Sequence, residues 1–129
     1  MATVQRFEDL KVWQIAREFC NDIYRITCYE QFSKDFSLKD QIKASSGSIM
    51  DNIAEGFERD GNKEFAQFLT IAKGSCGECR SQLHRSYDRQ YIENEEYEIL
   101  CQKAIDISKA IAAFNNYLRQ SEIKGIKYK

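Results

Sequence analysis

The chain contains no proline and only six glycines among its 129 residues. An all-β domain needs turn residues about every 8–12 positions, and this sequence cannot supply them. Long uninterrupted helices need neither residue type. The sequence therefore predicts an all-α protein, and its length suits a single domain, residues 1–129, with one hydrophobic core.

Apolar residues recur at three- and four-residue spacing in four segments, which places them on one face of each predicted helix. The expected helices cover roughly residues 7–32, 37–59, 62–91 and 94–122. Short connections between amphipathic helices of this length favour antiparallel neighbours. We therefore expect an up-down-up-down antiparallel four-helix bundle.

Polar residues mark the expected helix starts. Ser37 is a suitable N-cap for the second helix, with Asp40 three residues later in a pattern resembling a capping box. Asn62, after the turn glycine at position 61, is the expected N-cap of the third helix. Asn94 is the expected N-cap of the fourth, where the two glutamates that follow it suit the helix N-terminus. Gly125 is expected to end the fourth helix.

Charge and hydropathy argue for a cytoplasmic protein. The 19 basic and 20 acidic residues give a net charge of −1, whereas a dedicated nucleic-acid coat is usually strongly basic. No stretch approaches the ~18 apolar residues of a membrane span, and the charged N-terminus lacks the apolar region of a signal peptide. The five cysteines are then expected to be reduced.

A second apolar stripe runs along the first predicted helix, turned by about 100° from its core face. It is predicted to face another subunit, together with a line on the third helix that includes a costly mid-helix glycine. The residues concerned are Leu10, Trp13, Tyr24 and Cys28, and Ile71, Gly74, Glu78 and Gln82. The alternative is that Trp13 covers the core edge and the glycine has no role.

No residue pattern predicts catalysis, a cofactor or a bound metal. Cys76 and Cys79 form a C-x-x-C motif in mid-helix, with apolar residues at the same helical spacing. We therefore interpret both as core thiols, and the alternative is a redox or metal-binding site. His84 is the only histidine. We expect it to be exposed on the flank of its helix.

A local basic patch could still contact the phosphates of RNA or DNA. Arg85 and Arg89 lie four residues apart on one helix face, with Arg80 on its flank. The C-terminal segment adds Lys124, Lys127 and Lys129. An ordinary solvated surface would explain the same residues.

Several segments together resemble the four-helix bundle proteins encoded in intervening sequences of bacterial 23S ribosomal RNA genes. The likeness lies in residues 7–13 (FEDLKVW), residues 51–57 (DNIAEGF), residues 63–65 (KEF) and the Gly74-Ser75 pair followed by Glu78 and Gln82. It implies a homopentameric barrel without enzyme activity. A related branch, the accessory protein of diversity-generating retroelements, binds nucleic acid and reverse transcriptase.

The resemblance also suggests that Asn52, Glu55, Glu78 and Gln82 form hydrogen bonds at a subunit seam. The family often has proline where this chain has Met50, and commonly leucine at the positions of Cys76 and Cys79. The resulting hypothesis is a non-catalytic, oligomeric scaffold or adaptor for a protein or nucleoprotein partner. The alternative is an RNA- or DNA-binding accessory protein.

Overall fold

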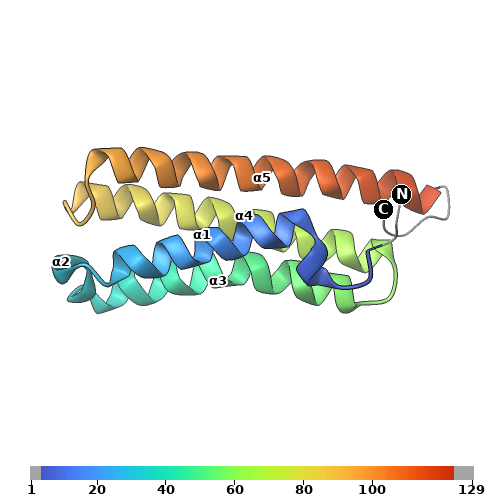
Figure 1. The fold of residues 1–129 in the computed structure, drawn as a ribbon, viewed down its shortest axis with the longest axis horizontal. Coiled ribbons are helices and arrows are strands. Elements are labelled where there is room, and N and C mark those ends of the chain that lie inside the picture. Colours follow the sequence, from blue (N-terminus) through green and yellow to red (C-terminus); the bar gives the residue numbers. More distant parts are fainter. Residues whose placement is uncertain (1–3, 124–129) are drawn as a thin grey trace.

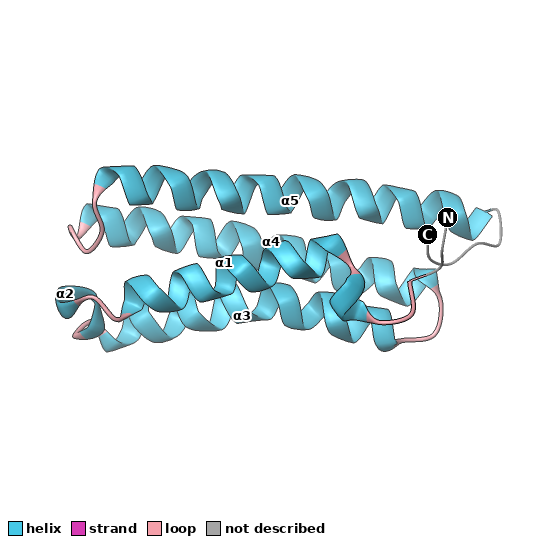
Figure 2. Ribbon diagram, in the orientation of Figure 1, coloured by secondary structure: helices cyan, strands magenta, loops and turns pink. Residues whose placement is uncertain are grey.

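A computed structural model describes residues 4–123, and all their regular structure is helical (Figures 1 and 2). The all-α class predicted from the sequence is therefore confirmed. Four helices are long, and a 3-10 turn and one short helix accompany them. The elements are η1 (Phe7–Asp9), α1 (Lys11–Thr27), α2 (Glu30–Ser33), α3 (Phe36–Glu58), α4 (Asn62–Asp88) and α5 (Asn94–Ile123).

The four long helices lie side by side along the longest axis of the molecule (Figure 1). Following the colours along the chain, each long helix runs opposite to the one before it. Helix α3 packs against α1 and α4, and α5 packs against α4 and α1. Helix α1 therefore has two seams, one with α3 and one with α5.

The core lies between the four helices and is built from the apolar stripes that the periodicity indicates. Its largest fully buried side chains include Phe19 of α1, Phe65 of α4 and Leu100 of α5. Burying each such side chain stabilises the fold by roughly 1.5–3 kcal/mol. No described helix is long and apolar enough to cross a membrane.

The first predicted helix differs from the observed one. The periodicity predicts one helix over residues 7–32, but α1 ends at Thr27, and Tyr29 is extended (φ −61°, ψ 146°) before α2 begins. The N-cap of α3 is Asp35, whose carboxylate accepts a hydrogen bond of 3.1 Å from the Leu38 N–H. The prediction of Ser37 as the cap is therefore wrong, because Asp35 satisfies the helix end two residues earlier.

The start of α4 also differs in detail. Gly61, with φ 91°, occupies the N-cap position, a backbone conformation that favours glycine. Asn62, expected to be the cap, is instead buried and donates a hydrogen bond of 3.2 Å to the Leu118 carbonyl. Helix α5 begins at Asn94, which is therefore its first helical residue and not its N-cap as expected; the Glu93 carbonyl accepts a hydrogen bond of 2.9 Å from the Tyr97 N–H. Gly125 lies outside the described residues.

Candidate functional site

The seam between α3 and α4 carries several of the residues predicted for a subunit interface. Ser48 and Ser75 hydrogen bond across it at 2.9 Å, and Asn52 donates to the Ser48 carbonyl at 2.8 Å. Ile71 lies one turn from Ser75 and is 51% exposed. The structure thus places Asn52 and Ile71 on the same pair of helices.

Glycines on these two helices have opposite surroundings. A Cβ atom at Gly56 would lie 2.7 Å from Phe68 Cβ and 2.9 Å from Phe65 Cδ1, which is closer than van der Waals contact allows. Helices α3 and α4 can therefore pack at their observed separation near Gly56 only because this residue has no side chain. At Gly74 and Gly77 a Cβ atom would meet nothing within 4 Å. Nothing in the described chain requires glycine at these two exposed positions.

Three residues predicted for the interface lie inside the subunit, and the prediction is wrong for them. Leu10 and Trp13 belong to the core; Trp13 is 8% exposed and its ring meets that of Phe7 at 5.2 Å. Gln82 is buried and accepts a hydrogen bond of 2.6 Å from Ser45. The η1 turn brings the N-terminal chain onto Trp13, which helical periodicity alone does not reveal.

The remaining interface candidates keep exposed side chains. Tyr24 is 58% exposed, and Cys28, Glu55 and Glu78 are also exposed. Glu55 forms an ion pair of 2.8 Å with Arg59 on its own helix. These residues are available at the surface, and the assembly that they are predicted to form stays a prediction.

The arginines predicted to contact nucleic acid do not form one patch. Arg85 donates to the Gln41 amide oxygen at 2.7 Å, and Arg89 pairs with Asp35 at 2.7 Å, so both are directed at α3 or its N-cap. Arg80 lies on the other side of α4, at a pocket of about 180 Å³ shared with α5. Lys124, Lys127 and Lys129 lie outside the described residues.

The C-x-x-C thiols are core side chains, as predicted. Cys76 and Cys79 are buried, and the Cys76 thiol donates to the Ala104 carbonyl at 3.1 Å. Burial raises the pKa of Cys76 to about 11 and that of Cys79 to about 12. Both thiols therefore stay protonated at neutral pH, which makes them poor nucleophiles and poor metal ligands.

Within residues 4–123, no three histidine, cysteine or acidic side chains are grouped so that they could hold a metal ion. His84 is exposed, as expected, and its Nδ1 lies 2.6 Å from the Tyr97 hydroxyl. The Tyr97 ring in turn stacks on Tyr87 with centroids 4.1 Å apart. This group joins α4 to the start of α5.

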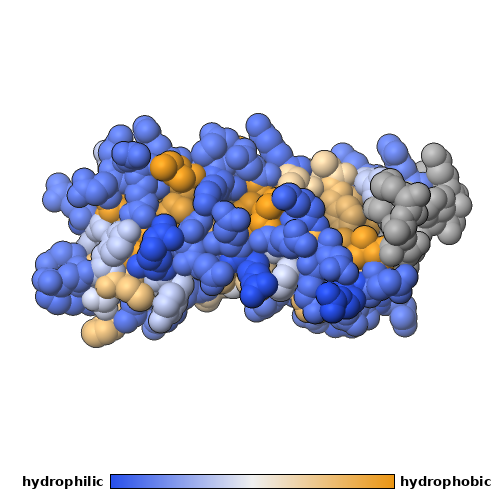
Figure 3. Space-filling view, in the orientation of Figure 1, coloured by the Kyte–Doolittle hydropathy of each residue, from blue (hydrophilic) through white to orange (hydrophobic). Residues whose placement is uncertain are grey.

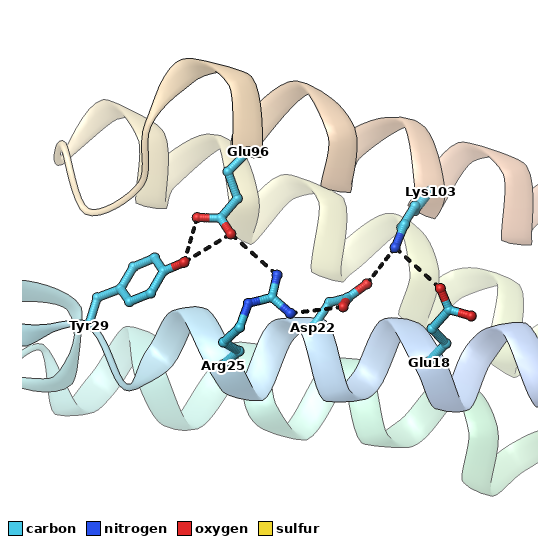
Figure 4. Close-up of polar contacts among 6 residues, drawn as sticks. All are labelled: Glu18, Asp22, Arg25, Tyr29, Glu96 and Lys103. Atoms are coloured by element: carbon cyan, nitrogen blue, oxygen red, sulfur yellow. Dashed lines mark hydrogen bonds and ion pairs between the residues drawn. The ribbon is translucent and has the colours of Figure 1, made fainter.

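A polar network that the sequence did not predict joins α1 to α5 (Figure 4). Lys103 of α5 pairs with Asp22 at 2.7 Å and Glu18 at 3.4 Å, and Arg25 bridges from Asp22 at 3.0 Å to Glu96 at 3.3 Å. The hydrogen bond to Asp22 is the main cause of the raised pKa of Lys103 and of Arg25. At the end of the network the Tyr29 hydroxyl donates to Glu96.

One sequence signal could have located this network. The members from α1 and the residue just beyond it recur at positions 18, 22, 25 and 29, which is helical spacing for a charged and polar edge. Hydrophobic side chains reach the surface along the same α1–α5 line, in patches separated by hydrophilic ones (Figure 3). The seam is thus held by charge where apolar packing is incomplete.

The described residues define a class of protein: an all-helical domain built on four long helices. The model of the 23S rRNA-intervening sequence protein family matches residues 8–113, and the chain belongs to this family. No curated protein matches the chain.

A solved structure from Bacteroides thetaiotaomicron VPI-5482 is similar to the chain. It is described as a protein with unknown function from the S23 ribosomal protein family. The two share 28% identity over 81% of this chain and 97% of that chain, with a TM-score of 0.74. The resemblance stated from the sequence is therefore confirmed for the 23S rRNA-intervening sequence proteins.

Proposed function

We propose that the chain is an up-down-up-down antiparallel four-helix bundle that self-associates and serves as a non-catalytic scaffold or adaptor. Its partner would be a protein or a nucleoprotein. The alternating helix directions in Figure 1 support the bundle arrangement. The family resemblance implies a pentamer, and the surface features themselves specify no number of subunits.

The observation that supports self-association best is the exposed surface of α4 around Gly74. Mid-helix glycine destabilises a helix by about 1 kcal/mol relative to alanine, yet Gly74 and Gly77 have open space around them. Ile71 adjoins them and is half exposed. A neighbouring subunit whose backbone approaches α4 closely would explain both the missing side chains and the exposed isoleucine.

The seam would be heterologous, joining the α4 surface of one subunit to a different surface of the next. Such a contact closes into a ring when the rotation between subunits permits it. Cys28 at the end of α1 remains a candidate for the second surface because its side chain is exposed. Asn52 and Glu55 lie on the α3 side of the first surface.

Light scattering tests the proposal against a matched pair of variants. The wild-type protein should scatter as several times its 15.1 kDa chain mass. Ile71→Glu should shift it toward monomer, because a buried unpaired charge is costly. Ile99→Glu is the control, since Ile99 is 49% exposed and lies on α5.

A wild-type chain that stays monomeric at concentrations on the order of tens of micromolar would refute self-association. Dissociation of both variants alike would contradict a seam that uses the α4 surface around Ile71 and leaves Ile99 outside. Circular dichroism checks that each variant remains helical, so that a loss of mass is not a loss of fold.

A further inference from the structure

The face shared by α1 and α3 carries three cations, and each lies over an aromatic ring. Arg17 Cζ is 5.5 Å from the Trp13 ring centroid, Lys43 Nζ is 5.5 Å from that of Tyr24, and Lys39 Nζ is 4.8 Å from that of Phe36. We call these six residues the cation–aromatic face.

The α3 members of this face form one continuous line. Phe36, Lys39 and Lys43 have i, i+3 and i+7 spacing, which places them on the same side of the helix. Lys43 reaches Tyr24 on α1, so the order along the surface is ring, cation, cation, ring. Positions 36 and 43 are separated by about 10 Å along α3 at 1.5 Å per residue.

No carboxylate balances these cations among residues 4–123. Arg17, Lys39 and Lys43 form no ion pair there, although the Lys39 ammonium group donates a hydrogen bond of 3.2 Å to the Ser33 carbonyl. The exposed Asp40, three residues before Lys43, is not within ion-pairing distance of any of them. The cations Arg25 and Lys103 on the α1–α5 seam, by contrast, both pair with carboxylates. Two lysines four residues apart repel each other, and an anion at this face would relieve that repulsion.

The two outer rings are highly exposed. Phe36 is 68% exposed and Tyr24 is 58% exposed, more than any other large hydrophobic side chain in the described chain. Exposed rings beside unpaired cations combine the two contacts that single strands use, which are stacked bases and charge-paired phosphates. The bases of a duplex are already stacked on one another and therefore have no free faces for these two rings.

We propose that the cation–aromatic face binds single-stranded nucleic acid, with bases stacked on Tyr24 and Phe36 and phosphates paired with Lys39, Lys43 and Arg17. The flexible lysine stems allow each ammonium group to move from its ring to a phosphate. This inference deepens the proposed function by giving the nucleoprotein partner a ligand class and a face. It depends on one part of the proposed function, the nucleoprotein partner, and does not depend on self-association.

Fluorescence anisotropy with labelled oligouridine RNA, and separately oligothymidine DNA, of about 12 nucleotides tests the proposal. The wild-type protein should bind, and tighter binding at lower salt is expected. Tyr24→Ala with Phe36→Ala should weaken binding by roughly fivefold to a hundredfold for each ring lost. Circular dichroism confirms folding, and light scattering follows assembly separately.

A second pair of variants addresses the charges. Lys39→Gln with Lys43→Gln should lower the slope of log affinity against log salt by about 1.4, since each single-strand phosphate contact contributes about 0.7. Lys63→Gln with Lys73→Gln removes the same charge from exposed lysines of α4 and should leave the affinity nearly unchanged.

The proposal would be overturned by no binding to either strand at low salt, by an equal loss in the α4 control, or by unchanged affinity without the two rings. Polyglutamate that competes as well as RNA would also overturn it, because an acidic peptide has no bases to stack. An assembled protein that fails to bind would contradict this inference alone. A monomeric protein that binds would contradict only self-association.

Discussion

The ammonium group of Lys103 on α5 lies 2.7 Å from the carboxylate of Asp22 on α1, two residues separated by 81 positions in the chain. Glu18 shares the same ammonium group at 3.4 Å. The Asp22 side chain is only 15% exposed, so this ion pair is better shielded from solvent than most surface pairs. It is the central contact of the seam between α1 and α5.

Lys103→Met should therefore lower the free energy of unfolding by about 0.5–1 kcal/mol at low ionic strength. The loss should shrink at high salt, because salt screens the exposed part of the network. Lys109→Met is the control on the same helix, since Lys109 has no ion pair among residues 4–123. Urea unfolding of both variants at two salt concentrations measures the difference; equal losses would contradict the role of the network.

Gly56→Ala should destabilise the protein by about 1–3 kcal/mol, because the added methyl group must displace Phe68 or Phe65 of α4. Gly74→Ala is the opposite case. It should stabilise the isolated subunit by about 0.5–1 kcal/mol, since the new methyl group meets nothing within 4 Å. Denaturant unfolding under conditions where light scattering shows monomer compares the two. A stabilising Gly56→Ala would mean that α3 and α4 can separate there at little cost.

Stability should fall as the pH rises above 9. The pKa values of Cys76 and Cys79 are raised from 9.0 to about 11 and about 12 in the folded chain. Between those values the unfolded chain has lost protons that the folded chain retains, so the free energy of unfolding decreases with pH. Thermal unfolding from pH 8 to 11 should show this loss, and Cys76→Ala with Cys79→Ala should make it shallower. An unchanged slope would place the responsible groups elsewhere.

Asp35 should govern part of the stability at acid pH. The Leu38 N–H, the Tyr91 hydroxyl and Arg89 all favour its charged form and lower its pKa from 3.8. The stability it contributes is therefore fully present above pH 3.8 and is lost as the pH falls through the lower, folded value. Asp35→Asn keeps a good N-cap but removes the charge, so it should flatten the acid limb of a stability–pH curve. Asp40→Asn, an exposed control, should leave that limb in place.

Asp35→Ala should cost more than Asp35→Asn, because it removes the helix cap as well as the charge. Loss of an N-cap typically destabilises by about 0.5–2 kcal/mol. Equal losses for the two variants at neutral pH would show that the cap hydrogen bond contributes little.

Helical periodicity is enough to predict the core. Phe19, Ile23 and Phe65 are fully buried as their spacing requires, since only one face of each helix can meet its neighbours. Periodicity cannot predict the burial of Trp13 and Leu10, because it depends on the N-terminal turn that precedes α1. The prediction for Gln82 is also wrong: a polar residue on a helix flank is interpreted as exposed unless its partner, here Ser45 from another helix, is known.

The interaction surfaces are harder to predict than the core. The Lys103–Asp22 contact joins positions 81 residues apart. The spacing of residues 18, 22, 25 and 29 indicates a polar edge of α1, but it does not identify Lys103 as the partner of Asp22. The cation–aromatic face is likewise hidden in the sequence, because the pattern relates Tyr24 to its own helix rather than to Lys43 of α3. The contacts of a charged side chain depend on which residues of other helices the fold places opposite it.

Helix α1 has two chemically different edges. Ion pairs add to the apolar packing of α1 against α5, whereas a cation–aromatic contact adds to its packing against α3. Rising ionic strength weakens the first kind of contact far more than the second. The earliest opening of the molecule in salt should therefore be a swing of α1 away from α5 about its line of contact with α3, with α3, α4 and α5 still packed together. The order in which the helices separate is thus set by which edge of a single helix carries its charge.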